Sequence, residues 1–170
     1  VSQGYKDITD ISVYAKFKLK DENTFILAWT TTPWTLPGNV ALAINPTIKY
    51  VKIEVEGVDV ILAQSRLSVI KSEYKIIEEF DAKTLIGKSY EPVFDYYIKD
   101  KTLKNAENGW KIYGADFVTT DSGTGVVHIA PAFGADDYEL SLKHNLPFIQ
   151  HVTQHGVFKP EVTDFAGQFV

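Results

Sequence analysis

The stretch TTTPWTLPGNVALAINP, residues 30–46, places four threonines, a tryptophan and two prolines ahead of an apolar run. Proline fixes φ and lacks a backbone donor, so Pro33 and Pro37 interrupt any strand that enters this segment. The apolar residues FILAW at 25–29 and the run at 40–44 are typical of strands on either side. The stretch is therefore either a tight corner between two strands or the wall of a pocket for a small polar ligand.

The rest of the chain favours many short strands and few helices. Apolar and polar residues alternate over 11–19, Glu56 and Gly57 form a plausible hairpin turn, and 133–145 has acidic residues at its start and basic ones at its end, as a helix does. Further strands are predicted at 50–55, 58–62, 74–80, 110–118 and 126–129, and a short helix at 65–74. We expect one domain over residues 1–170, mainly β with peripheral helices (α+β), with a β-barrel-like core.

Composition excludes several classes of function. The 170 residues carry a net charge of −5 and a single arginine, Arg66, which argues against broad nucleic-acid binding. Cysteine is absent, so thiolate nucleophiles and zinc–thiolate sites are excluded. With no apolar run of about 20 residues and no signal peptide, we expect a cytoplasmic location and no membrane contact. The absence of methionine and the start at Val1 suggest a segment excised from a longer protein.

A second stretch, DSGTGVVHIAPAFGADDYEL at 121–140, could carry chemistry. It would bring His128 on a strand close to Asp136 and Asp137 at a helix start, with a glycine-rich turn at 123–125 that admits close approach of a ligand. Each feature also has an ordinary structural explanation: a hairpin turn, a hydrogen-bonded histidine, and carboxylates that complement a helix dipole. Individually, none of them identifies a site.

Signatures of other enzyme classes are missing. There is no G-x-S-x-G elbow, no P-loop and no dinucleotide-binding G-x-G-x-x-G motif. His151 and His155 are four residues apart, but in a strand-like segment this spacing does not align them, so we predict neither a metal nor another cofactor. If the chain is a hydrolase, water is the expected nucleophile.

Together, WTTTPWTLPGNVALAINP and GTGVVHIAPAFGADDY closely resemble the paired motifs of the editing domain of class I aminoacyl-tRNA synthetases for branched aliphatic amino acids. The resemblance covers almost the whole chain. The sequence Thr31-Thr32-Pro33-Trp34 is similar to the isoleucyl form, whereas valyl and leucyl relatives carry arginine after two threonines and an acid in place of Trp34. One departure is Phe133, where many bacterial isoleucyl enzymes have histidine.

The resemblance implies a barrel core and hydrolysis of valine mischarged onto the isoleucine tRNA. The implied partners are the 3′ CCA end of that tRNA and the rest of the parent synthetase, with a monomeric isolated domain. Asp137 would bind the α-ammonium of the valyl group, with Asp136 the weaker candidate, and His128 would help to exclude isoleucine. The other implied contacts to the ester and the terminal adenosine are Thr30, Thr31, Thr32, Trp34, Gly123, Thr124 and Gly125. We expect Thr31, Thr32 and Asp137 to be catalytic, with Thr32 and backbone groups positioning the water.

Three other interpretations remain open at this stage. The chain could be a valyl- or leucyl-type editing domain, although Trp34 and His128 count against it. It could be a non-catalytic module that binds aminoacyl-adenosine, which the presence of Asp137 with three threonines disfavours. It could also be a structural interaction domain, which would leave the joint presence of both motifs unexplained.

Overall fold

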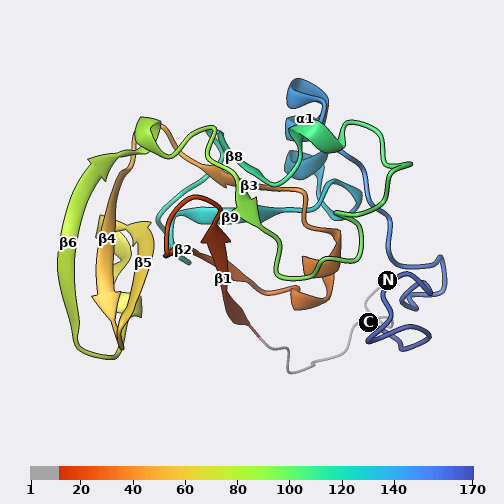
Figure 1. The fold of residues 1–170 in the computed structure, drawn as a ribbon, viewed down its shortest axis with the longest axis horizontal. Helices are drawn as coiled ribbons and strands as arrows, with labels where there is room; N and C mark the ends of the chain where they lie inside the picture. Colours follow the sequence, from red (N-terminus) through yellow and green to blue (C-terminus); the bar gives the residue numbers. More distant parts are fainter. Residues whose placement is uncertain (1–11) are drawn as a thin grey trace, which may run out of the picture.

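The computed structural model describes residues 12–170, and their strands form two sheets (Figure 1). The larger sheet has the strand order β6-β4-β5-β2-β1-β7 and the smaller one the order β8-β3-β9. The strands of the larger sheet are β1 (Val13–Leu19), β2 (Thr24–Thr30), β4 (Lys49–Val55), β5 (Val58–Ala63), β6 (Tyr74–Asp81) and β7 (Tyr90–Glu91). Those of the smaller sheet are β3 (Ala41–Ile44), β8 (Lys111–Gly114) and β9 (Val126–Ile129).

The β1–β2 hairpin shows both strand patterns that the sequence predicts. In β1 the alternation buries Phe17 and Leu19 and exposes Lys16, while β2 is buried more continuously because it pairs antiparallel with β1 and parallel with β5. Ile11, the first residue of the predicted strand, lies outside the described residues. Beyond this hairpin, Glu56 and Gly57 connect β4 to β5 with φ values of 52° and 78°, as a tight hairpin turn requires.

The main core lies between the two sheets. Phe17 and Ile26 of the larger sheet pack in one cluster with Leu42 and Ile44 of the smaller sheet, and all four are fully buried. A smaller cluster lies on the opposite face of the larger sheet, where Leu67, Val69 and Ile70 cover it. The larger sheet is therefore covered on both faces next to β5, and its outer face becomes exposed toward β1.

The α+β prediction is confirmed, but its barrel-like part is not, because both sheets are open over residues 12–170. The edge strand β6 is exposed along almost its whole length, and β7 has only two residues. Between β2 and β3 the chain forms the 3₁₀ helix η2 (Pro33–Gly38), which contains both prolines. This corner places β3 in a second sheet, so the strands do not close into a ring.

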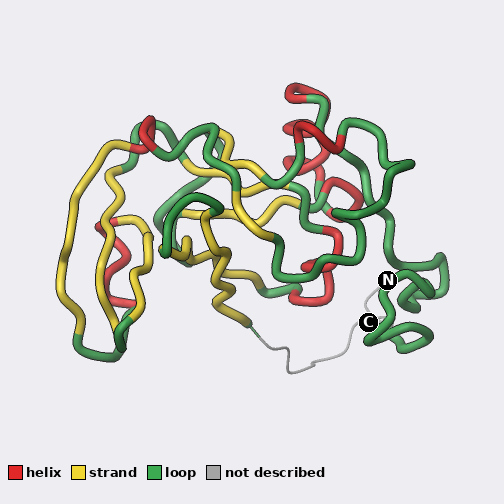
Figure 2. The backbone as a smooth tube through the Cα atoms, viewed as in Figure 1, coloured by secondary structure: helices red, strands yellow, loops and turns green. Residues whose placement is uncertain are grey.

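Helical structure is sparse, as Figure 2 shows. The helix predicted at 133–145 is present as α1 (Ala135–His144), whereas the one predicted at 65–74 is only the 3₁₀ helix η3 (Gln64–Val69). The remaining 3₁₀ helices are η4 (Ala82–Thr84), η5 (Ala106–Asn108) and η6 (Pro131–Phe133). Among the helices of residues 12–170, none combines the length and apolar character needed to span a membrane.

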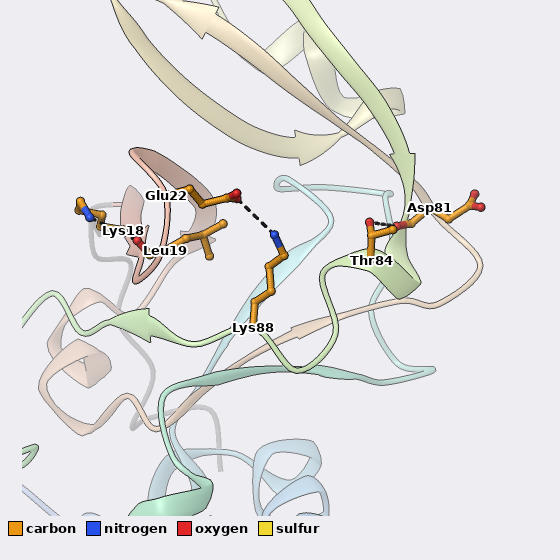
Figure 3. A network of polar contacts seen from close by, with 6 residues as sticks. All are labelled: Lys18, Leu19, Glu22, Asp81, Thr84 and Lys88. Atoms are coloured by element: carbon orange, nitrogen blue, oxygen red, sulfur yellow. Dashed lines mark hydrogen bonds and ion pairs between the residues drawn. The ribbon is translucent and has the colours of Figure 1, made fainter.

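A polar network closes one end of the β1–β2 hairpin (Figure 3). Lys88 Nζ lies 3.4 Å from Glu22 Oε1 in the turn between the two strands, and Thr84 Oγ1 donates to the Asp81 carbonyl at 2.7 Å. The Lys88–Glu22 contact, together with the Lys20 N–H donated to the Ser89 carbonyl at 3.0 Å, holds the segment before β7 against the hairpin, whereas the Thr84 bond closes the turn after β6. The other end of the hairpin, where β2 meets the threonine stretch, stays open for a site.

Candidate functional site: a pocket between two sequence motifs

The threonine stretch forms a corner held by its own hydroxyl groups. Thr30 Oγ1 accepts the Thr32 N–H at 3.0 Å, and Thr35 Oγ1 donates to the Thr32 carbonyl at 2.8 Å. Thr30 and Thr35 are buried, whereas Thr31 and Thr32 are exposed. The corner therefore presents two accessible hydroxyls at the point where β2 ends.

This corner borders a pocket of about 350 Å³ that the second motif completes. Both motifs that the sequence singled out therefore line one cavity, as do all the predicted site residues except Trp34 and Asp136. The lining residues are Trp29, Thr30, Thr31, Thr32, Thr35, Phe117, Thr119, Ser122, Gly123, Thr124, Gly125, Val126, Val127, His128, Ala130, Phe133 and Asp137.

His128 is fixed in the pocket wall by hydrogen bonds to both ring nitrogens. Asn39 Nδ2 lies 2.8 Å from Nδ1 and also donates to the Ala41 carbonyl at 2.9 Å, which fixes the orientation of the amide. Nδ1 must therefore accept, so the ring proton is on Nε2, where it is donated to Thr35 Oγ1 at 2.8 Å. On its other side, Asn39 Oδ1 accepts from the Tyr90 hydroxyl at 2.5 Å.

This arrangement keeps His128 neutral. Burial lowers the pKa of its imidazole from 6.5 to about 3, with a smaller contribution from nearby His151. A second ring proton would also place Nδ1–H against the amide hydrogens of Asn39. With its one lone pair occupied, His128 is suited to shape a wall and not to accept a proton from water.

Asp137 supplies the only carboxylate among the described residues that line this pocket. It lies in the first turn of α1 and is half-buried, and its Oδ2 accepts the Ala130 N–H at 2.8 Å. Burial raises the pKa of its carboxyl, which that hydrogen bond partly offsets. Asp136, the preceding residue, is exposed and borders a different cavity, because adjacent side chains of a helix point about 100° apart.

The glycine-rich turn forms the opposite wall through its backbone. Gly123 and Gly125 have φ values of 70° and 77°, a region that favours glycine. A Cβ on Gly125 would lie 2.6 Å from the Cβ of Ala63, and one on Gly123 would lie 3.2 Å from the Trp29 ring. The Thr124 hydroxyl is buried and donates to the Leu27 carbonyl at 2.6 Å, so it anchors the turn to β2.

Trp34 does not line the pocket. Its carbonyl accepts from His151 Nε2 at 2.8 Å, and its ring packs edge-on against Phe133 with centroids 5.1 Å apart. Phe133 is the residue that lines the cavity, so Trp34 supports the wall from behind. The aromatic residue of the first motif that does line the pocket is Trp29, which precedes the threonines directly.

Sequence reasoning also missed other residues of the lining, among them the polar Thr35, Thr119 and Ser122 and the aromatic Phe117. Only Thr35 had a usable signal, since it is the fourth threonine of the quoted stretch and lies one helical turn after Thr32. The other three belong to the connection before the glycine-rich turn, where no periodicity marks them. Among residues 12–170, no group of three or more His, Asp or Glu side chains is placed to hold a metal ion.

Solved structures share this fold. The chain resembles the structure described as GlLeuRS-CP1 with a TM-score of 0.64 at 16% identity, over 78% of this chain and 59% of that one. It resembles the editing domain of the P. knowlesi cytosolic leucyl-tRNA synthetase with a TM-score of 0.57 at 14% identity, over 79% and 63%. The fold is therefore that of aminoacyl-tRNA synthetase editing domains.

Sequence similarity is more specific. The chain is 47% identical over 170 residues to the isoleucine–tRNA ligase of Clostridium kluyveri and 45% identical over 172 residues to isoleucine–tRNA ligase 2 of Bacillus anthracis. Each match covers all of this chain and 16% of the ligase. No protein-family model matches the chain. The chain belongs to the isoleucine–tRNA ligase family, as an editing-domain segment of it.

Proposed function

We propose that residues 1–170 form a single editing domain of a longer isoleucine–tRNA ligase. In this proposal the domain hydrolyses the ester that joins mischarged valine to the isoleucine tRNA, without a cofactor. The observation that carries it is the meeting, in one cavity, of the Asp137 carboxylate with the threonines at 30–32. Valine and isoleucine differ by one methylene, and binding by isoleucine–tRNA ligases separates them only about 150-fold, so a second, smaller pocket is needed.

Asp137 binds the α-ammonium group of the valyl ester in this proposal. An ionised carboxylate in a half-buried position attracts a cation more strongly than one in open water, because the local dielectric is lower. The Ala130 N–H holds one carboxylate oxygen. Gly134 leaves space for the other, since a Cβ at that position would lie 2.9 Å from Asp137 Oδ1.

His128 limits the size of the amino acid. Its ring is locked by Asn39 and Thr35, so it cannot rotate away from a larger side chain without breaking both hydrogen bonds. Dense packing of this kind makes one additional methylene costly to accommodate. Replacement of His128 by alanine removes this wall, and we expect the variant to hydrolyse the isoleucyl ester as well as the valyl ester.

Hydrolysis then depends on orientation more than on proton abstraction. Neither the neutral His128 nor the ammonium-bound Asp137 is available as a strong base. The exposed Thr31 and Thr32 hydroxyls and nearby backbone groups position the water, and a ribose hydroxyl of the substrate assists. A positioned water without a strong base suffices because an aminoacyl ester is already activated toward hydrolysis.

The proposed macromolecular partners are the 3′ CCA end of the mischarged tRNA and the remainder of the ligase. A net charge of −5 favours contact with one strand end over a whole tRNA, so most phosphate contacts would come from the parent enzyme. We propose that the isolated domain is monomeric, binds tRNA weakly and acts in the cytoplasm.

Deacylation assays test this function. Valyl and isoleucyl esters of the isoleucine tRNA are incubated with this chain at high concentration and with the parent ligase, and release of the free amino acid is followed. We expect release of valine and retention of isoleucine. Equal hydrolysis of both esters by the parent ligase would refute the size selection.

A second candidate is a module that binds aminoacyl-adenosine without hydrolysing it. The absence of a free general base among the described lining residues favours it. A non-hydrolysable valyl-adenosine analogue separates the two functions: if the parent ligase binds the analogue through this pocket yet leaves the valyl ester intact, the domain is a binding module.

A further inference from the structure

We infer that the outer face of the β1–β2 hairpin binds the single-stranded RNA that precedes the terminal nucleoside held in the pocket. The surface consists of Tyr14, Lys16, Phe25 and Trp29, which we call the hairpin stripe. The inference rests on the proposed function, because it extends the path of the same substrate out of the pocket.

Strand register places these side chains on one face. In the antiparallel pairing Tyr14 lies opposite Trp29, Lys16 opposite Leu27, and Lys18 opposite Phe25. Directly paired residues share a face, and every second residue along a strand does too. Tyr14 is 47% exposed, Lys16 is exposed, and Phe25 and Trp29 are half-buried, so aromatic rings and a cation alternate on an accessible surface.

The stripe begins inside the pocket. Trp29 lines the cavity, and its ring packs against the backbone of Gly123 on the opposite wall. Tyr14 is the neighbour of Trp29 on the adjacent strand, about 5 Å away, and Lys16 lies one two-residue step farther along β1. A chain that leaves the pocket past Trp29 therefore meets Tyr14 and then Lys16.

Positive charge is available along this path. Lys16 Nζ lies 5.6 Å from the centroid of the Phe25 ring and forms no ion pair with an acidic side chain within residues 12–170. Arg66, the single arginine of the chain, donates from Nε to the Gly123 carbonyl at 2.8 Å, which holds its guanidinium beside the pocket wall. Lys18, by contrast, faces Glu91 on β7.

This chemistry matches a single strand of RNA. Aromatic rings provide stacking surfaces for bases of any identity, and cations between them balance the phosphates. Lys16 and Arg66 supply this positive charge beside the pocket, although the chain as a whole has a net charge of −5. A protein partner would instead favour a contiguous apolar patch depleted of lysine.

The test compares two esters of valine. One is valyl-tRNA, which carries the single-stranded 3′ end, and the other is valyl-adenosine, which lacks all preceding nucleotides. Hydrolysis of both is measured with the parent ligase carrying Tyr14→Ala or Lys16→Gln, with Lys75→Gln on the distant edge strand β6 as the matched control. Tyr14→Phe keeps the ring and serves as the conservative variant.

We expect Tyr14→Ala to lower the ratio of kcat/KM for valyl-tRNA over valyl-adenosine about tenfold, a loss typical of one stacked base. Lys16→Gln should lower the same ratio, because it removes a cation that balances a phosphate. Tyr14→Phe and Lys75→Gln should retain the wild-type ratio. Anisotropy with a short single-stranded RNA ending in CCA gives a second readout, in which Lys16→Gln lowers the salt slope by about 0.7.

Two outcomes overturn the inference. A wild-type ratio in both Tyr14→Ala and Lys16→Gln shows that the RNA does not cross the stripe. An equal loss with Lys75→Gln shows a general effect of charge. If the wild-type ligase hydrolyses neither ester while the short RNA still binds through Tyr14 and Lys16, the proposed function fails and the RNA-binding surface stands.

Discussion

Lowering the pH from 7 to 5 should reduce the free energy of unfolding of the chain, because His128 is neutral in the folded state and gains a proton on unfolding. The imidazole pKa is lowered by burial from 6.5 to about 3 in the folded state. Unfolding exposes the ring and restores the ordinary value, so the unfolded chain binds a proton that the folded chain does not. The contribution of the neutral His128 to the free energy of unfolding is therefore fully present above pH 6.5 and is lost as the pH falls toward 3.

The magnitude follows from the two pKa values. At pH 5.0, the unfolded-state pKa lies 1.5 units above the solution pH, and each unit corresponds to about 1.4 kcal/mol, so His128 removes about 2 kcal/mol of the free energy of unfolding between pH 7 and pH 5. His144 and His151 have pKa values lowered by burial and act in the same direction. The contribution of His128 must therefore be isolated by a variant.

Urea denaturation at pH 7.0 and pH 5.0 measures this contribution, with His128→Gln as the partner of the wild type. The variant is less stable at both pH values because it alters the bonds to Asn39 and Thr35, but it does not titrate. We expect the wild type to lose about 2 kcal/mol more than the variant on acidification. Equal losses would refute the neutral, locked imidazole and reopen a role for His128 as a base.

Three other perturbations give separate tests. Asp137→Ala should abolish valine release in the deacylation assay while circular dichroism shows an intact fold. Asp136→Ala should still release valine, and retained valine release by Asp137→Ala would remove Asp137 from the site. Tyr90→Phe should lower the free energy of unfolding by about 1–3 kcal/mol, since its buried hydroxyl is the donor to a side-chain amide, and unchanged urea stability would contradict that bond. Gly125→Ala should melt at a lower temperature than Gly57→Ala, which has the same sign of φ but open space around it; equal melting temperatures would show that packing against the turn does not matter.

Local sequence patterns predicted the elements that follow from short-range periodicity and from charged residues at helix ends. The β9 strand at Val126–Ile129 matches its predicted bounds, and α1 differs from the predicted helix by a few residues. The predicted helix at 65–74 shortened to η3 because the chain turns there to cover the outer face of the larger sheet. Whether a sheet closes into a barrel depends on which strands pair across long stretches of sequence, so local patterns could not predict that both sheets are open.

The two tryptophans of the first motif show why the site was only partly predictable. Both Trp29 and Trp34 flank the threonines, and the motif alone does not distinguish their roles. Trp29 lies on a strand whose outer face leads into the cavity, whereas the 3₁₀ corner at Pro33 turns the Trp34 ring toward Phe133 and its carbonyl toward His151. The direction of a side chain after a proline corner follows from packing, which spacing along the chain does not encode.

The position of Asp137 was more predictable because a helix start fixes it. Two adjacent aspartates in a first turn cannot face the same cavity, and the structure places only the second one in the pocket. The neutral state of His128 was not predictable, since it depends on Asn39, 89 residues away along the chain. The carboxylate at the helix start provides charge, and the locked imidazole in the same lining provides a shape without charge. In the proposed function the pocket separates two amino acids with identical charged groups, and both features are then needed, because only shape can distinguish one methylene.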